Sequence, residues 1–180
     1  MKLYIALFRG INIGRTRSLP MRELVELLAG LGLQNIRTYI QSGNVIFETA
    51  EGDRAQLAQR ISGVVQDSRG FSPEVLLLEP ADLENAIASN PYPEAEHFHR
   101  TLHVFFLADV PPNPDLKKLE SLRQGNEGFA LQGRLFYLHT PDGVGRSKLA
   151  AGIERALGVP ATGRNWQTVS RLMALVSSSG

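Results

Sequence analysis

The stretch "IRTYIQSGNVIFE", residues 36–48, decides how this chain folds. Residues 35–41 and 45–48 are rich in β-branched and aromatic side chains, which is typical of strands. Between them, Ser42-Gly43-Asn44 is typical of a hairpin turn. The stretch therefore predicts a β-hairpin around which the rest of the first half can be placed.

Helical segments flank this hairpin on both sides. Apolar residues recur at helical spacing within residues 21–31 and again within residues 53–68. Short apolar runs of strand length at residues 3–8 and 74–78 enclose the two helices. Residues 1–79 therefore predict the element order β-α-β-β-α-β.

The second half of the chain repeats most of this order. The expected elements are a helix at 80–89, a strand at 101–108, a helix at 115–124, a hairpin of strands 129–132 and 135–139, a helix at 147–157 and a final helix at 164–176. A helix therefore stands where a last strand would be expected. Strands that pair through hairpins, with helices between them, favour antiparallel sheets covered by helices.

The predicted fold class is α+β, with tandem ferredoxin-like (α-β plait) units whose antiparallel sheets have helices packed on them. Residues 1–79 form the first βαββαβ unit, and residues 80–180 form the second unit with an additional C-terminal helix. A single mixed sheet is the alternative.

The composition is that of a globular protein. The hydrophobic fraction of 43% predicts a packed core, and the absence of cysteine excludes disulfides and thiolate zinc sites. The apolar run before Arg9 is too short for a signal-peptide core, and no run has the length of a membrane-spanning helix. We expect a soluble, cytoplasmic protein without a membrane partner.

The net charge of +1 hides a segregated distribution. Residues 1–22 carry five cationic side chains and no acid, whereas residues 70–99 carry six acids and no Lys or Arg. A ligand responds to local fields more than to the total charge. We interpret the acidic stretch as a solvated face.

Residues 9–20, RGINIGRTRSLP, place three arginines and two glycines between a predicted strand and a predicted helix. Three residues separate the glycines where a P-loop has four, and the GxGxxG spacing fails as well, so we reject nucleotide hydrolysis. Glycine lets the backbone approach a ligand, and arginine offers a planar fork that matches phosphate or carboxylate. The predicted anion-binding residues here are Arg9, Gly10, Asn12, Gly14 and Arg15.

A similar order of residues follows a strand in the second half. Gly145-Arg146-Ser147 repeats the order glycine, arginine, hydroxyl of Gly14-Arg15-Thr16, so Arg146 and Ser147 join the predicted site. The alternative is that both stretches are turns, with Ser147 or Thr16 near a helix cap and the arginines in solvent.

Two further polar groups are candidates for the same site. Arg164 and Asn165 lie at the predicted start of the final helix, for which Thr162 is a plausible cap, and Trp166 belongs to its apolar stripe. In the hairpin, strand alternation places Arg37, Tyr39 and Gln41 on one polar face. Gln41, with Ser42 and Asn44 of the adjoining turn, completes the candidates.

Four motifs, YIALFRGINIG, TYIQSGNVIF, GVGRSKL and ATGRNWQTV, resemble the bacterial domain of unknown function 1697 family. The resemblance implies a tandem pair of ferredoxin-like units and assigns no activity. The matching motif positions are Arg9, Gly10, Asn12, Gly14, Gln41, Ser42, Gly43, Asn44, Gly145, Arg146, Ser147, Arg164, Asn165, Trp166 and Thr168.

The favoured reading is a non-catalytic binding protein without a cofactor, which holds an anionic, phosphorylated ligand such as a nucleotide or RNA with its Gly/Arg loops. Residues 3–6 faintly resemble the first-strand motif of RNA-recognition domains, in which Tyr4 would stack on a base. The partner motif is missing, and amphipathic aromatic residues usually pack, so we interpret Tyr4 as a core residue.

Three other readings stay open. The chain is alternatively an enzyme that acts on a small anionic metabolite, with His139 as general base. A metal site at His97, His99 and His103 is less favoured, and we predict no metal. A scaffold that binds protein is the last reading, and no protein partner is indicated.

Overall fold

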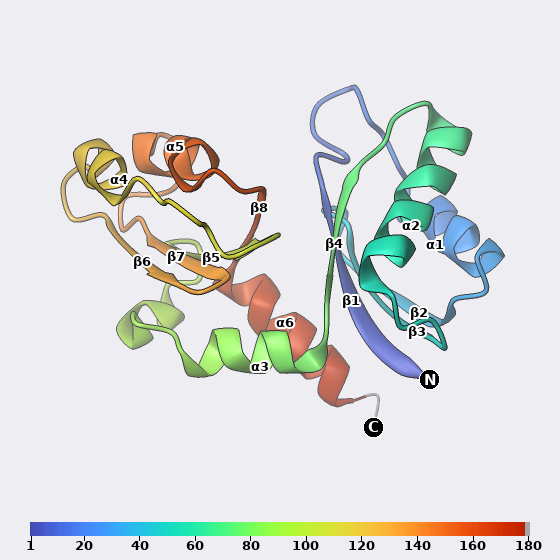
Figure 1. The fold of residues 1–180 in the computed structure, drawn as a ribbon. Coiled ribbons are helices and arrows are strands. Elements are labelled where there is room, and N and C mark those ends of the chain that lie inside the picture. The colour runs from blue at the N-terminus through green and yellow to red at the C-terminus, as the bar shows by residue number, and fades with distance from the viewer. Residues whose placement is uncertain (179–180) are drawn as a thin grey trace. The chain divides into compact units, whose positions relative to one another are not determined.

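The computed structural model describes residues 1–178 of the 180-residue chain. These residues form two antiparallel four-stranded sheets and six α-helices (Figure 1). In chain order the elements are β1 (Lys2–Arg9), α1 (Met21–Gly30), β2 (Gln34–Tyr39), β3 (Asn44–Thr49), α2 (Arg54–Arg69), β4 (Glu74–Leu78), α3 (Pro80–Ala88), a 3-10 helix (Pro93–His97), β5 (Leu102–Leu107), α4 (Leu116–Leu122), β6 (Gly128–Gln132), β7 (Leu135–His139), α5 (Lys148–Leu157), β8 (Ala161–Asn165) and α6 (Trp166–Ser177).

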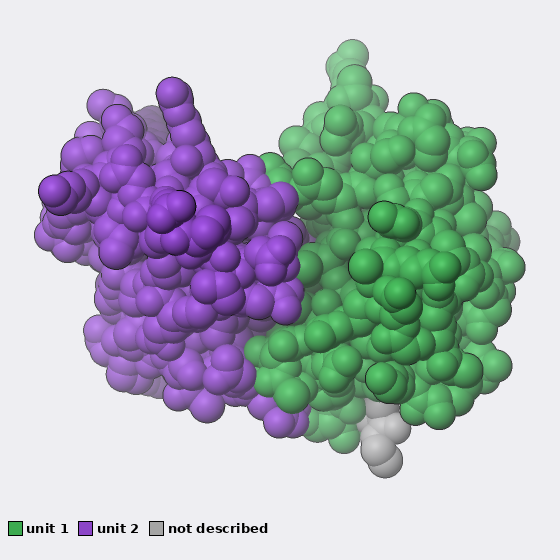
Figure 2. All heavy atoms as spheres, in the orientation of Figure 1, with its two compact units in different colours: residues 1–83, 175–180 green, residues 84–174 purple. Residues whose placement is uncertain are grey.

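The chain divides into two compact units (Figure 2). Unit 1 contains residues 1–83 and the end of the chain from Leu175, and unit 2 contains residues 84–174. The first boundary therefore lies inside α3, close to the predicted division at residue 79. The division into a first unit of residues 1–79 and a second unit of residues 80–180 stays a prediction.

The sheet of unit 1 has the strand order β2-β3-β1-β4. The predicted hairpin is confirmed, because β2 and β3 pair antiparallel with Tyr39 opposite Asn44. Its turn requires glycine at position 43, where φ is +77° and a Cβ atom would lie 2.6 Å from the Cβ of Phe8. The turn is thereby packed directly against the strand at the centre of the sheet.

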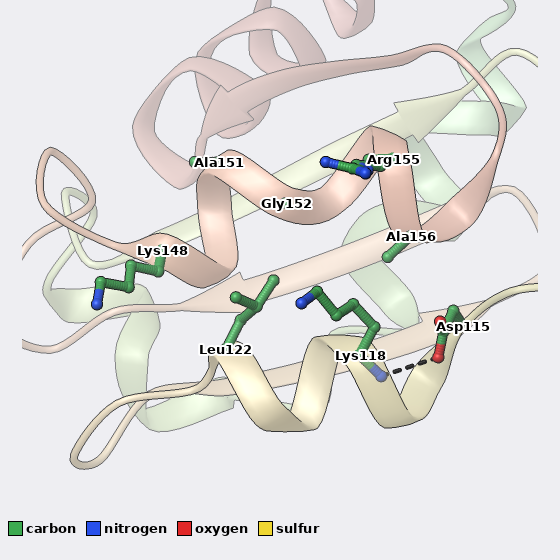
Figure 3. A pocket seen from close by; sticks show the side chains of 8 residues that line it. All are labelled: Asp115, Lys118, Leu122, Lys148, Ala151, Gly152, Arg155 and Ala156. Carbon is green, nitrogen blue, oxygen red and sulfur yellow. Dashed lines mark hydrogen bonds between the residues drawn. The ribbon is translucent and has the colours of Figure 1, made fainter.

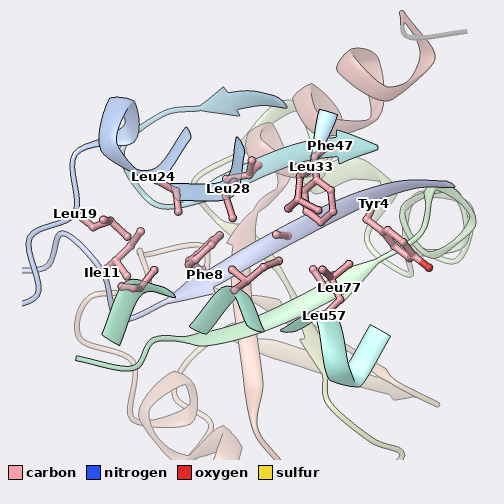
Figure 4. Close-up of a cluster of buried hydrophobic side chains, with 14 of the residues drawn as sticks. Tyr4, Phe8, Ile11, Leu19, Leu24, Leu28, Leu33, Phe47, Leu57 and Leu77 are labelled. Carbon is pink, nitrogen blue, oxygen red and sulfur yellow. The ribbon is translucent and has the colours of Figure 1, made fainter. Parts of the chain in front are cut away.

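Helices α1 and α2 cover one face of this sheet (Figure 1). Alternate residues of β1 point toward them, so that Tyr4, Ala6 and Phe8 are buried in one cluster with side chains from both helices, among them Leu28 and Leu57 (Figure 4). The core position that was the favoured interpretation of Tyr4 is confirmed, since its side chain is fully buried.

The sheet of unit 2 has the strand order β6-β7-β5-β8, with α4 and α5 over one face (Figure 1). Its core places Phe136 and Leu138 of β7 against apolar side chains of the two helices, among them Leu119, Leu149 and Ile153. The predicted hairpin around Gly133 is confirmed, because β6 and β7 pair antiparallel.

The predicted final helix is present as α6 but begins at Trp166, and the expectation that a helix replaces the last strand is wrong, because residues 161–165 form strand β8, which pairs antiparallel with β5. Gly163, which argues against a strand, allows the ring of Phe105 to lie over β8. A Cβ atom there would meet that ring at 2.6 Å. Thr162 is buried within the strand and does not cap the helix. Unit 2 therefore has the complete order β-α-β-β-α-β.

No helix within residues 1–178 is both long enough and apolar enough to cross a membrane.

Candidate functional site

The loop between β1 and α1 is held in shape by one side chain. We call residues 10–18 the Arg15 loop. The amide of Asn12 donates hydrogen bonds to the carbonyl oxygens of Leu19 and Gln41, both at 2.8 Å, and its oxygen accepts from the backbone N–H of Leu19 at 2.7 Å. The backbone N–H of Asn12 donates to the carbonyl of Arg17 at 3.0 Å, which closes the loop on itself. The polar groups of Asn12 therefore hold the shape of the loop.

Both glycines of the Arg15 loop have positive φ, and they differ in what surrounds them. A Cβ atom on Gly10 would lie 3.2 Å from Nη1 of Arg17, so the glycine accommodates a guanidinium of its own loop. Gly14 has no atom within 4 Å of such a Cβ position and lies in an exposed run from Ile13 to Ser18. The backbone around Gly14 is therefore the part of the loop that a ligand can approach.

Arg9, the first arginine of the predicted site, contacts a carboxylate. It ends β1 opposite Glu74 of β4, and its Nη1 lies 2.7 Å from Oε2 of Glu74. This cross-strand pair neutralises the charge of Arg9 at the end of β1 from which the Arg15 loop departs.

The turn of the β2–β3 hairpin lies beside the Arg15 loop at this end of β1, and hydrogen bonds of main-chain carbonyls and side-chain amides hold the two together. Gln41 contributes its carbonyl oxygen to Asn12. The amide of Asn44, which is fully buried, donates to the carbonyl of Tyr39 at 3.0 Å and to Oγ of Ser42 at 2.9 Å. The structure thus brings Asn12, Gln41, Ser42 and Asn44 together, and each of them has a structural role there.

Two arginines at this end of β1 differ from most others in unit 1. Five arginines of the unit are ion-paired: Arg9, Arg22, Arg54, Arg60 and Arg69. Within residues 1–178, the guanidinium groups of Arg15 and Arg17 have neither an ion-pair partner nor a hydrogen-bond partner, and both residues are exposed. The Arg15 loop therefore presents two positive charges that the fold leaves uncompensated.

The second basic loop, residues 143–147, is here called the Arg146 loop. The alternative that Ser147 is a helix cap is confirmed, because its Oγ accepts from the N–H of Ala150 at 3.0 Å at the start of α5. Arg146 is exposed and makes no side-chain hydrogen bond or ion pair within the described part of the chain. Thr16 differs from Ser147, since α1 begins after Pro20 without a side-chain cap.

The two basic loops occupy different positions in their units. The Arg15 loop follows the first strand of its unit, whereas the Arg146 loop follows the third strand, β7. The first and third strands run antiparallel in both units. If the two units are superposed strand by strand, the Arg15 loop and the Arg146 loop therefore lie at opposite ends of the strands. The shared order of glycine, arginine and hydroxyl is therefore not a copy of one repeated site.

Arg164 and Asn165 lie on β8, and each serves the fold of unit 2. Asn165 ends the strand at the sheet edge from which the Arg146 loop departs, and its Oδ1 accepts from the N–H of Thr168 at 2.9 Å in the first turn of α6. Arg164 donates to the carbonyl of Gly163 at 2.9 Å, and burial lowers its pKa to about 10, so it stays charged at neutral pH.

Of the histidines named in the alternative readings, His139 and His99 contact other residues of unit 2. The ring of His139 packs against Tyr92 with ring centroids 5.2 Å apart. His99 contacts the carbonyl of Glu96 through Nδ1 at 2.9 Å, whereas His103 is half-buried in β5. Across residues 1–178, no group of three or more His, Cys, Asp or Glu residues is placed to hold a metal ion.

A family model described as "Protein of unknown function (DUF1697)" matches residues 1–137. The chain belongs to this family. The matched range includes the Arg15 loop and the hairpin, while the Arg146 loop and β8 lie beyond it.

The chain is similar to a solved structure, described as that of the conserved bacterial protein SP0830 from Streptococcus pneumoniae. The TM-score is 0.65 and the sequence identity is 23%, with 96% of this chain and 97% of that chain covered. At this identity the likeness shows a shared fold. No functionally curated protein matches the chain.

Sequence reasoning did not include Arg17 among the site residues, although it lies in the stretch that defined the site. The available signal was the local density of arginine without any acid in residues 1–22. The approach of its guanidinium to Gly10 depends on the positive φ at positions 10 and 17, which the sequence does not reveal.

Proposed function

We propose that this protein is a non-catalytic binding protein for a phosphate-bearing ligand, which Arg15 and Arg17 hold on the Arg15 loop. The observation that carries the proposal is that these two guanidinium groups are exposed and uncompensated, whereas the same unit pairs five other arginines with carboxylates. Arginine near phosphate forms charge-assisted, bidentate hydrogen bonds, which are stronger than those between neutral groups.

The anchoring of the loop supports the same conclusion. Asn12, near the start of the loop, makes hydrogen bonds to Leu19, which directly follows the loop, and to Gln41 in the turn between β2 and β3. A loop that is already ordered loses less conformational entropy when it binds a ligand. The Arg146 loop, with one exposed arginine beside the cap of α5, is a second and weaker anion site in this proposal.

We also propose that the chain consists of two ferredoxin-like units in tandem. Each unit has the element order β-α-β-β-α-β, and its first strand lies in the sheet between the third and last strands. This arrangement supports a tandem pair of ferredoxin-like units. We place the protein in the bacterial cytoplasm, which is consistent with a chain without cysteine and with a bacterial structure of similar fold.

Among phosphate-bearing ligands, the structure favours a small molecule such as a nucleotide over RNA bound on a sheet face. RNA-recognition domains stack bases on aromatic residues of the open face. Tyr4, the aromatic residue of the faint motif, points instead into the core beneath α1 and α2. On the opposite face, the side chains of Ile5 and Leu7 of β1 are aliphatic and fully buried, so β1 has no aromatic residue there on which a base could stack.

The alternative enzymatic reading gains no support from the geometry. His139 packs against Tyr92, and Ser42 accepts a hydrogen bond from Asn44. The remaining test of catalysis is product formation from a phosphorylated substrate that His139→Ala abolishes.

The proposal is tested by thermal unfolding in low salt with pyrophosphate, ATP, a sugar phosphate and a short RNA as probes. We expect at least one phosphate-bearing probe to raise Tm of the wild type, and the shift to shrink as salt is added. The double variant Arg15→Gln/Arg17→Gln removes the two uncompensated charges and should lose most of the shift.

Arg22→Gln is the matched control, because Arg22 is an exposed arginine of the same unit that pairs with Glu26 on α1. It should retain the wild-type shift. The proposal is wrong if no probe raises Tm, or if Arg22→Gln reduces the shift as much as the double variant does.

A further inference from the structure

A groove on unit 2 lies outside the proposed site. It runs between α4 and α5 and has a volume of about 580 Å³. Its lining residues are Asp115, Lys118, Leu122, Lys148, Ala151, Gly152, Arg155 and Ala156 (Figure 3). The volume falls within the range of about 300–1,000 Å³ that is usual for small-molecule sites.

The charge of the groove is positive. Lys118, Lys148 and Arg155 have no ion-pair partner within residues 1–178. The single carboxylate of the lining, Asp115, accepts from the backbone N–H of Lys118 at 2.9 Å and caps α4. Figure 3 shows the side chain of Lys118 extending from α4 toward α5. Three cationic side chains therefore line the groove. Its one carboxylate, that of Asp115, already accepts a hydrogen bond.

The cations lie at both ends of the groove wall. Lys148 and Arg155 are seven residues apart on one face of α5, a separation of about 10 Å along a helix axis. Between them the wall includes Ala151 and Gly152, and Gly152 lies against Leu122 of α4. A Cβ atom on Gly152 would lie 2.4 Å from Cδ1 of Leu122, so glycine is what lets the two helices approach here.

The floor of the groove is aliphatic. The lining contains neither an aromatic ring nor a hydroxyl or amide side chain. A nucleobase would find no ring to stack on and no side-chain amide or hydroxyl to read its edge. An aliphatic chain would instead bury apolar surface against Leu122, Ala151 and Ala156.

We infer that this groove binds an amphiphilic anion, a phosphate or carboxylate carried on a single aliphatic chain. The head group pairs with the lysine and arginine side chains, and the chain lies on the aliphatic floor. The inference is independent of the proposed function, because no residue of the Arg15 loop lines the groove.

The test is isothermal titration calorimetry of the full chain with n-octyl phosphate below its critical micelle concentration. Octanoate replaces the head group, inorganic phosphate lacks the chain, and octyl glucoside lacks the charge. We expect octyl phosphate and octanoate to bind about ten-fold or more tightly than either of the other two probes, because only they use both features of the groove.

Two variants locate the binding. Ala151→Leu places a larger side chain at an exposed lining position of α5 with good helix propensity, so it should reduce affinity about ten-fold while Tm stays unchanged. Lys118→Gln should weaken binding of both anions, and the matched control Lys117→Gln, an exposed neighbour that does not line the groove, should not.

Three results would overturn the inference. Octyl phosphate and octanoate fail to bind the wild type, inorganic phosphate or octyl glucoside binds as tightly as they do, or Ala151→Leu and Lys118→Gln bind like the wild type. Arg15→Gln/Arg17→Gln should leave the affinity for octyl phosphate unchanged. Failure of the groove inference can therefore be told apart from failure of the proposed function.

Discussion

The side-chain amide of Asn12 donates a 2.8 Å hydrogen bond to the main-chain carbonyl of Gln41, and so joins the Arg15 loop to the turn between β2 and β3. The same amide group also contacts both backbone polar groups of Leu19. One side chain thereby fixes the loop at two points. These contacts are the physical basis for the proposal that the loop binds an anion.

Asn12→Ala should lower the free energy of unfolding by about 2–3 kcal/mol, because three hydrogen bonds to the backbone are lost and buried backbone groups lose partners. Asn35→Ala is a matched control. Both asparagines have positive φ, at 54° and 52°, but Asn35 contacts only the exposed carboxylate of Glu48. Urea unfolding should show a loss below about 1 kcal/mol for the control, and equal losses would contradict the anchoring role of Asn12.

The turn of the first hairpin should tolerate no side chain at position 43. Gly43→Ala combines a left-handed backbone, at φ +77°, with a Cβ atom 2.6 Å from Phe8 Cβ and Ile11 Cδ1. We expect a loss of about 2–4 kcal/mol. Gly70→Ala separates the two causes, since its φ is +76° with no atom within 4 Å, and it should lose about 1 kcal/mol. Chemical denaturation that ranks Gly70→Ala at or above Gly43→Ala would refute the packing argument.

Two buried tyrosines should respond to loss of their hydroxyl groups in opposite directions. The hydroxyl of Tyr4 is buried without a hydrogen-bond partner among residues 1–178, so Tyr4→Phe should leave stability unchanged or raise it by about 1 kcal/mol. The hydroxyl of Tyr137 donates to the carbonyl of Ala86 at 2.6 Å, so Tyr137→Phe should lose about 1–2 kcal/mol. Thermal unfolding of the two variants side by side checks the difference in sign.

Stability should depend on pH through His103. Burial lowers the pKa of this histidine below its ordinary value of 6.5, so the unfolded chain binds the proton first as the pH falls. The contribution of His103 is therefore complete above pH 6.5 and is lost as the pH falls through 6.5 toward the lower folded-state pKa.

The measurement is the free energy of unfolding between pH 7.5 and pH 5. His103→Gln should flatten this pH dependence, whereas His97→Gln, an exposed histidine, should follow the wild type. A wild-type slope that survives in His103→Gln would assign the effect to other groups.

Local sequence signals were sufficient for most elements of the fold. Strand-type residues on either side of Gly43 and Gly133 located both hairpins, and helical periodicity located α1 and α2. Strand β8 was missed because its residues ATGRN carry no apolar alternation and contain a glycine. The strand exists because β5 offers an edge and the ring of Phe105 covers Gly163, both of which are tertiary effects.

The candidate site was predictable as a region but not as a set of contacts. Local composition pointed to the Arg15 loop, and the distinction between its residues depends on partners that are distant in sequence. Glu74, which pairs with Arg9, lies 65 residues away, and Gln41, which fixes Asn12, lies 29 residues away. The strand register places the carboxylate of Glu74 beside Arg9, whereas no carboxylate among the described residues pairs with Arg15.

The most direct measurement of the central claim is an NMR titration of the 15N-labelled protein with pyrophosphate at low ionic strength. The account predicts saturable shifts of backbone amides concentrated in residues 10–18 and in the adjoining turn, residues 40–43, and their loss in Arg15→Gln/Arg17→Gln. Shifts confined to other parts of the chain, or shifts that persist in the double variant, would contradict it.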